Sequence, residues 1–177
     1  GTAYYYPGLY AGKTDSSPDN GYSFISAAQA GSLHLFAAVI GAQAVREGGT
    51  VLAESYTETA RLYDWAVSSF SWRNVTMEHK TVATMPVRYG LGRGTVDLSP
   101  AETVRLLLPN SVTDEDITYT IALQARSGDE ALTAPVSRGE VLGSMTVSIP
   151  GQPEFKVPLI AEQSVEMDRK TFFKDEL

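Results

Sequence analysis

Gly8-Leu-Tyr-Ala-Gly-Lys-Thr-Asp-Ser-Ser-Pro-Asp-Asn-Gly-Tyr-Ser-Phe24 is the stretch around which the fold of this chain can be worked out. It contains a basic-hydroxyl-acidic triplet, Lys13-Thr14-Asp15, and then a turn and a new apolar segment. A lysine beside a threonine can hold nucleotide phosphate, as in the pattern G-x-x-x-x-G-K-[ST]. It can also lie on an exposed strand and receive a substrate carboxylate.

The residues around the triplet argue against the phosphate interpretation. A phosphate loop opens directly into a helix, because the helix N-terminus supplies the backbone donors that hold the anion. Here Asp15-Ser-Ser-Pro-Asp-Asn-Gly21 follows, and Pro, Asn, Asp and Gly favour a turn. The pattern also requires glycine at position 7, where this chain has Pro7.

On the other interpretation the stretch resembles the third motif, Lys-Thr-Gly, of the serine D-alanyl-D-alanine carboxypeptidases, the low-molecular-mass penicillin-binding proteins. Three further blocks carry the resemblance over nearly the whole chain. They are Gly21-Tyr-Ser-Phe-Ile-Ser-Ala-Ala28, Leu35-Phe-Ala-Ala-Val-Ile-Gly41 and Leu132-Thr-Ala-Pro-Val-Ser-Arg-Gly-Glu-Val-Leu-Gly143. The last block is similar to a repeated Ala-Pro and Gly-x-x-x-Gly signature of the family's C-terminal module.

The resemblance implies a role for each residue of the triplet region. Lys13 would supply positive charge to the active site, and Thr14 would hydrogen-bond the terminal carboxylate of a D-Ala-D-Ala peptide. The backbone N–H of Ser16 would contribute to the oxyanion hole. From the triplet alone, an exposed strand edge is the preferred explanation of Lys13 and Thr14, and the downstream blocks reverse this preference.

Asp15 departs from the family pattern, which has glycine at this position. An aspartate there adds a negative charge beside a site meant for a carboxylate. Two like charges about 4 Å apart repel by about 4 kcal/mol at an effective dielectric constant near 20. Either Asp15 points away from the substrate, or the parent protein is a weakened or inactive relative.

The chain lacks the family's other two motifs. A nucleophilic serine three residues before a lysine, S-x-x-K, places an amine beside the hydroxyl to take its proton, and no such pair occurs in the sequence. No S-x-N is present either. Two isolated histidines, His34 and His79, favour neither a Ser-His-Asp triad nor a metal site, and we expect no metal and no cofactor. Nucleophile and base would therefore come from a region upstream of this chain, and the chain alone is expected to be inactive.

Composition narrows the possible partners and locations. The net charge of -7 argues against nucleic acid, which requires a basic surface, and the absence of cysteine excludes disulfides and thiolate sites. No apolar run reaches the ~18 residues of a transmembrane helix, and the first residues lack the pattern of a signal peptide. The resemblance nevertheless implies a bacterial cell-envelope protein, with its leader upstream and a possible membrane anchor beyond the C-terminus.

Two patterns predict how the first part of the chain folds. Two apolar segments between Tyr22 and Gly41 are separated by Ala30-Gly-Ser32, which predicts an antiparallel hairpin in one sheet with the Lys-Thr strand. Apolar residues spaced by three and four predict a helix over residues 53–70 that packs on this sheet. They are Tyr56, Ala60, Tyr63, Ala66, Val67 and Phe70. The stretch from Gln43 to Leu52, with Gly48-Gly49, is expected to be a connecting loop.

After Thr76 the spacing of apolar residues changes to two, which is typical of strands. Alternation runs through residues 104–108, 117–123, 145–149 and 155–159, with turns between them. The predicted fold class is therefore α+β, a partial transpeptidase-like sheet with a helix followed by an all-β, sandwich-like domain. We place residues 1–76 in the C-terminal part of a carboxypeptidase domain and residues 77–177 in a β-rich C-terminal domain.

Three functional hypotheses follow. The first is a portion of a serine-type D-Ala-D-Ala carboxypeptidase that trims peptidoglycan stem peptides. It would bind β-lactams only when its upstream segment is present. The second is a catalytically dead homologue or an envelope-binding module. The third, a nucleotide-binding protein, depends on the phosphate interpretation of Lys13.

Overall fold

The computed structural model describes residues 6–47, 50–124 and 131–175 of the chain. The chain divides into two compact units, Gly1–Ser71 and Trp72–Leu177. The division precedes the boundary expected between residues 76 and 77, because Trp72 to Asn74 belong to a strand that pairs within the second unit. None of the described helices combines the length and apolar character that crossing a membrane would take.

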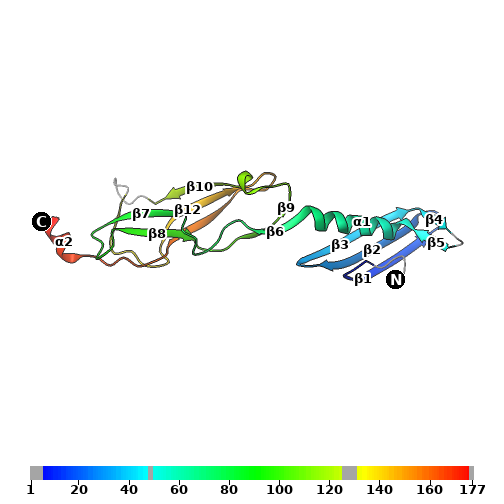
Figure 1. Cartoon of the computed structure of the whole chain (residues 1–177), viewed down its shortest axis with the longest axis horizontal. Helices are drawn as coiled ribbons and strands as arrows, with labels where there is room; N and C mark the ends of the chain where they lie inside the picture. The colour runs from blue at the N-terminus through cyan, green and yellow to red at the C-terminus, as the bar shows by residue number, and fades with distance from the viewer. Residues whose placement is uncertain (1–5, 48–49, 125–130, 176–177) are drawn as a thin grey trace. The chain divides into compact units, whose positions relative to one another are not determined.

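The first unit is a sheet with one helix on it (Figure 1). Its main sheet has the order β1-β2-β3, and both strand pairs are antiparallel. The strands of this unit are β1 (Leu9–Ser17), β2 (Gly21–Ala30), β3 (Leu33–Ala42), β4 (Ala44–Glu47) and β5 (Thr50–Ala53). The predicted hairpin is confirmed as β2 and β3, which Gly31 and Ser32 connect, and Gly31 has the left-handed φ of 59° that suits glycine.

The prediction of a connecting loop over residues 43–52 is wrong. β4 and β5 form a two-stranded antiparallel hairpin, in which Ala44 is paired with Ala53 and Arg46 with Val51. The strands could not be recognised from the sequence, because apolar and polar side chains do not alternate clearly in this stretch. Gly48 and Gly49 lie outside the described residues.

The predicted helix is confirmed as α1 (Glu54–Ser69), which packs on β2 and β3. The ring of Phe24 on β2 lies 4.7 Å from the ring of Tyr56, centroid to centroid. The predicted apolar face is only partly right, because the fully buried helix residues are Ser55, Thr59 and Tyr63. Burial of Thr59 is tolerated because its hydroxyl donates to the carbonyl oxygen of Ser55 at 2.7 Å.

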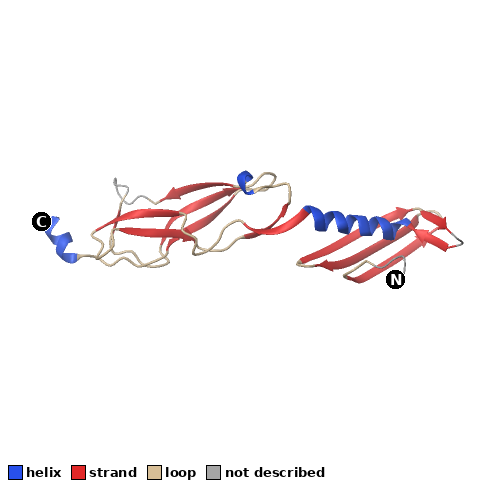
Figure 2. Ribbon diagram, viewed as in Figure 1, coloured by secondary structure: helices blue, strands red, loops and turns tan. Residues whose placement is uncertain are grey.

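Strands make up most of the regular secondary structure of the second unit, and loops connect them (Figure 2). One sheet has the order β10-β12-β13-β8-β7-β11, and β6 pairs with β9 in a second, two-stranded sheet. The strands are β6 (Phe70–Asn74), β7 (Ala83–Arg88), β8 (Thr95–Pro100), β9 (Arg105–Pro109), β10 (Thr118–Leu123), β11 (Leu132–Thr133), β12 (Val141–Ser148) and β13 (Phe155–Ala161). A 3-10 turn, η1 (Asp114–Asp116), precedes β10, and α2 (Arg169–Asp175) follows the last strand.

The core of the second unit follows the predicted alternation in β9, β12 and β13, whereas β10 is exposed along its whole length. Leu108 on β9, Val147 on β12 and Leu159 on β13 are all 0% exposed. They join a cluster that also contains Val96 and Leu98 of β8. The β-rich character expected for this part of the chain is therefore confirmed, and a period of two was the correct signal for it.

Candidate functional site

All four predicted site residues lie on β1, the outermost strand of the β1-β2-β3 sheet among the described residues. Lys13, Thr14, Asp15 and Ser16 are exposed, and the turn through Pro18 follows directly. The expectation that Lys13 and Thr14 occupy an exposed edge strand is confirmed. The phosphate-loop interpretation is wrong, because Lys13 is in the middle of a strand and the next helix begins only at Glu54.

Lys13 and Thr14 face opposite sides of the sheet. Thr14 is paired with Phe24 and Lys13 with Ile25, and paired residues of antiparallel strands project to the same face. Phe24 contacts Tyr56 of α1, so Thr14 faces the helix. Gly12 shares this orientation, because a Cβ atom added to it would lie 2.7 Å from the Phe24 ring. Lys13 and Asp15 therefore share the face that is turned away from α1.

A pocket of about 500 Å³ borders β1 near the first turn of α1. It is lined by Thr14, Asp15, Ser16, Tyr22, Ser23, Ala53, Ser55 and Tyr56. Most of these side chains carry a hydroxyl group, which can both donate and accept a hydrogen bond. The lining includes neither lysine, arginine nor histidine, and its one carboxylate belongs to Asp15, so the pocket can orient a polar group but offers no amine or imidazole to activate a hydroxyl.

The face that carries Lys13 is apolar and open. Ile25 is 58% exposed, Phe36 is 78% exposed and Ile40 is 75% exposed. Ile25 is paired with Ala38 in the centre of the sheet, and Phe36 and Ile40 alternate with residues of β3 that face α1. We call the side of the sheet that carries Lys13, Ile25, Phe36 and Ile40 the open face. Large apolar side chains at such exposure typically mark a surface that another element covers.

Two groups of residues were missed at the sequence level, one in each unit. Ser55 and Tyr56 line the pocket although they lie about forty residues beyond Thr14 in the chain. No local pattern joins them to the Lys-Thr strand, because only the packing of α1 on the sheet does so. The carboxylate of Glu162 in the second unit was missed as well. It accepts a hydrogen bond from the Ser99 hydroxyl and lies 3.2 Å from Nδ1 of His79.

These hydrogen bonds have an electrostatic consequence for Glu162. The Ser99 hydroxyl, followed by the His79 ring, holds the pKa of the Glu162 carboxyl below its usual value. His79 is exposed and has this carboxylate as its partner. Ser99 and His79 both contact Glu162, whereas a catalytic triad needs the histidine between serine and carboxylate. Within residues 6–47, 50–124 and 131–175, no group of three or more His, Asp or Glu residues could hold a metal ion.

Comparison with known proteins adds independent information about both units. The family model described as "Penicillin-binding protein 5, C-terminal domain" matches residues 70–167. D-alanyl-D-alanine carboxypeptidase DacF of Bacillus subtilis (strain 168) is 21% identical over 162 residues, which is 92% of this chain and 38% of DacF. D-alanyl-D-alanine carboxypeptidase DacC of Escherichia coli (strain K12) is 24% identical over 155 residues, 87% of this chain and 35% of DacC. The chain thus spans little more than a third of the length of these relatives.

Solved structures give similar matches. Penicillin-binding protein 5 from Haemophilus influenzae aligns with a TM-score of 0.48 and 20% identity, over 87% of this chain and 41% of that chain. The D-alanyl-D-alanine carboxypeptidase DacD from Francisella tularensis aligns with a TM-score of 0.49 and 16% identity, over 92% of this chain and 37% of that chain.

Proposed function

Because the chain belongs to the family of the penicillin-binding protein 5 C-terminal domain, we propose that it is a portion of a serine-type D-Ala-D-Ala carboxypeptidase. The enzyme would trim peptidoglycan stem peptides in the bacterial cell envelope. Residues 1–76 would complete its catalytic, transpeptidase-like domain, and residues 77–177 would form its β-rich C-terminal domain. The S-x-x-K and S-x-N motifs would be supplied by a segment outside this chain.

The observation that carries the proposal is the position of Lys13 on the open face. Lys13 lies on an exposed edge strand and projects to the same side as Ile25, whose neighbours Phe36 and Ile40 are about three-quarters exposed. An element that buried these side chains would bring its own residues next to the Lys13 ammonium. A catalytic serine on that element would therefore sit beside a fixed positive charge, which favours the developing oxyanion.

In this proposal some residues of β1 bind the substrate and others stabilise the charge that develops during the reaction. Thr14 would hydrogen-bond the terminal carboxylate of the stem peptide, and the backbone N–H of Ser16 would contribute to the oxyanion hole. An extended substrate can add along β1, because an edge strand offers unpaired backbone groups. By register Asp15 projects with Lys13 and away from Thr14, so its charge would weaken the effect of Lys13 more than it repels a carboxylate held by Thr14.

The test compares the chain alone with the protein extended by its upstream segment. Alone, the chain should form no adduct with a fluorescent penicillin that survives denaturation, because none of its serines precedes a lysine by three residues. With an upstream segment that carries both missing motifs, labelling and carboxypeptidase activity should appear. In that protein Lys13→Ala should lower kcat/KM at least about a hundredfold, the usual effect of removing a group that stabilises the oxyanion.

Two further variants sharpen this test. Lys156→Ala, on the exposed side of β13, is the matched control and should leave kcat/KM unchanged. Asp15→Gly should raise kcat/KM, because it removes the negative charge beside Lys13. Labelling of the isolated chain would contradict the proposal by revealing a nucleophile within it. An unchanged kcat/KM for Lys13→Ala would show that Lys13 is not part of the active site.

A catalytically dead homologue that acts as an envelope-binding module is the second candidate. Asp15 favours it, because it replaces the glycine of the family motif. If this candidate is correct, fluorescent penicillin should not label the extended protein, even after Asp15→Gly. An extended protein that is labelled before any substitution would exclude it.

A further inference from the structure

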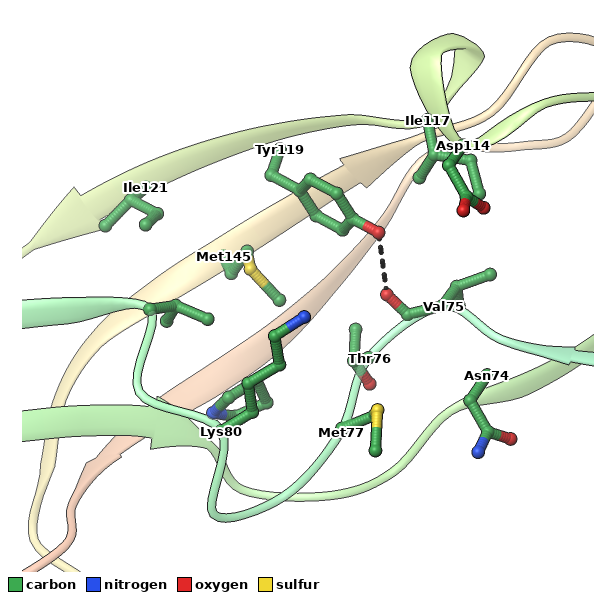
Figure 3. Close-up of a pocket in the computed structure, with 12 residues that line it drawn as sticks. Asn74, Val75, Thr76, Met77, Lys80, Asp114, Ile117, Tyr119, Ile121 and Met145 are labelled. Carbon is green, nitrogen blue, oxygen red and sulfur yellow. Dashed lines mark hydrogen bonds between the residues drawn. The ribbon is translucent and has the colours of Figure 1, made fainter.

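The second unit contains a groove that the proposed carboxypeptidase does not use. Its volume is about 500 Å³, within the range of small-molecule sites. All its lining residues belong to the second unit, and they include Met77, Lys80, Asp114, Tyr119, Ile121 and Met145. Figure 3 shows these side chains around the space between β10, β12 and the segment that follows β6.

The groove exists because the core of the unit is covered incompletely at this end. Tyr119 and Ile121 alternate along β10 toward the side of the buried Met145, yet they remain 48% and 38% exposed. The Tyr119 hydroxyl donates to the carbonyl oxygen of Val75 at 2.9 Å, so the phenol ring is fixed across the opening. Burial, and then the charge of Asp114, raise the pKa of Tyr119, which keeps this phenol neutral and able to donate.

Lys80 points into the groove, toward Tyr119 and Met145 (Figure 3). Its segment is held in place on both sides. The Glu78 N–H donates to the Thr103 hydroxyl at 3.1 Å, and the Val82 N–H donates to the Leu98 carbonyl at 2.9 Å. The ammonium group itself takes part in none of the ion pairs that the described residues form.

The charges that line the groove favour an anion. Among the described residues, Asp114 is the only carboxylate that lines the groove, and it is paired with the guanidinium of Arg73. Within that part of the chain Lys80 forms no ion pair, although the chain as a whole has a net charge of -7. An anion that the rest of the surface repels would be attracted at this place.

The remaining walls suit an aromatic body. The Tyr119 ring and the thioethers of Met77 and Met145 all line the groove. Methionine side chains adapt to the shape of a ligand, and their sulfur atoms make favourable contacts with aromatic rings. We propose that this groove binds small organic anions with an aromatic body, with Lys80 holding the acidic group and the ring lying between Tyr119 and the two methionines.

Anilinonaphthalene sulfonate, an aromatic sulfonate, tests the proposal on the full chain. The chain has four methionines, so the methyl groups of methionine labelled with carbon-13 report where the probe binds. The signals of Met77 and Met145 should shift saturably, whereas those of Met85 and Met167, which do not line the groove, should not. Fluorescence alone would not suffice, because the open face of the first unit can also bind the probe.

Lys80→Met should weaken the binding at the groove about tenfold, the effect expected for losing a charge-assisted hydrogen bond. Lys156→Met removes an equal charge from β13 and should leave the affinity unchanged. N-phenylnaphthylamine, which lacks the sulfonate, should bind more weakly than the sulfonate. Equal shifts of all four methyl signals, equal affinities of the two lysine variants, or tighter binding of the neutral amine would each overturn the proposal. Penicillin labelling of the extended protein is independent of all these outcomes.

Discussion

The two units of this chain bury their apolar side chains to very different degrees. The second unit closes around a core in which Val96, Leu98 and Leu159 are 0% exposed. In the first unit α1 covers one face of a sheet whose other face leaves Phe36 78% exposed. The second unit therefore encloses a core of its own, whereas the sheet of the first unit is covered on one face only.

The same difference is visible in what is buried. The helix of the first unit buries Ser55 and Thr59 beside Tyr63, so polar groups occupy its interface with the sheet. The second unit also buries hydroxyl groups, those of Thr76 and Ser99, but beside a much larger cluster of apolar side chains. Burying a hydroxyl costs free energy unless it is hydrogen-bonded, so both units depend on such bonds, and the second gains more from packed apolar area.

The largest effect that this comparison predicts concerns one apolar truncation in each unit. Leu98→Ala should lower the free energy of unfolding of the second unit by about 2–5 kcal/mol, because it leaves a cavity in a packed core. Phe36→Ala should change the stability of the first unit by less than about 0.5 kcal/mol, because the ring is already in water. Urea denaturation checks both values, with Trp65 reporting on the first unit and Trp72 on the second. Similar costs for the two variants would mean that Phe36 is covered in solution.

A second prediction concerns the packing of β1 on the helix side of the sheet. Gly12→Ala should destabilise the first unit by about 1–3 kcal/mol, because the new methyl group meets the Phe24 ring and forces it to move. Gly94→Ala in the second unit is the control, since a Cβ atom there has no neighbour within 4 Å. Thermal unfolding of both variants measures the difference. If Gly12→Ala were as stable as the control, Phe24 would not be held against Tyr56 as described.

A smaller effect is expected for the buried hydroxyl pair of the first unit. The Ser26 and Tyr63 hydroxyls lie 2.8 Å apart, and both residues are buried. Tyr63→Phe should cost about 1–2 kcal/mol, because it leaves the Ser26 hydroxyl buried without this partner. Adding Ser26→Ala should recover part of the loss, and a double-mutant cycle in urea measures the coupling. Strictly additive effects would show that the hydrogen bond contributes nothing to stability.

The smallest effect depends on pH and belongs to the second unit. Because the folded pKa of Glu162 is lowered, its carboxylate stabilises the folded state above the usual value of 4.5, and this contribution is lost as the pH falls through the folded pKa. Glu162→Gln should therefore lower the unfolding free energy by about 1 kcal/mol at neutral pH, and the difference should shrink in acid. Thermal unfolding across the acid range measures this difference. The exposed Glu166→Gln is the control, and a constant difference at all pH values would contradict the argument.

Many of the elements were predictable because they depend on neighbours along the chain. The spacing of three and four residues from Tyr56 to Phe70 predicted α1, and Gly31 predicted the turn between β2 and β3. Alternation predicted the buried positions of β12 and β13, where Val147 and Leu159 are fully buried. The Lys-Thr strand was placed correctly for the same reason, since Pro18 to Gly21 left no room for a helix.

Other features required the tertiary structure, because they depend on which segments meet in space. Helical spacing does not say that α1 turns Ser55 and Thr59 to the sheet while Val67 stays 41% exposed. Successive side chains of a strand point to opposite faces, but this rule does not tell which of Lys13 and Thr14 faces a helix. Only the packing of Tyr56 on Phe24 decided that Thr14 borders the pocket beside α1 and that Lys13 belongs to the open face.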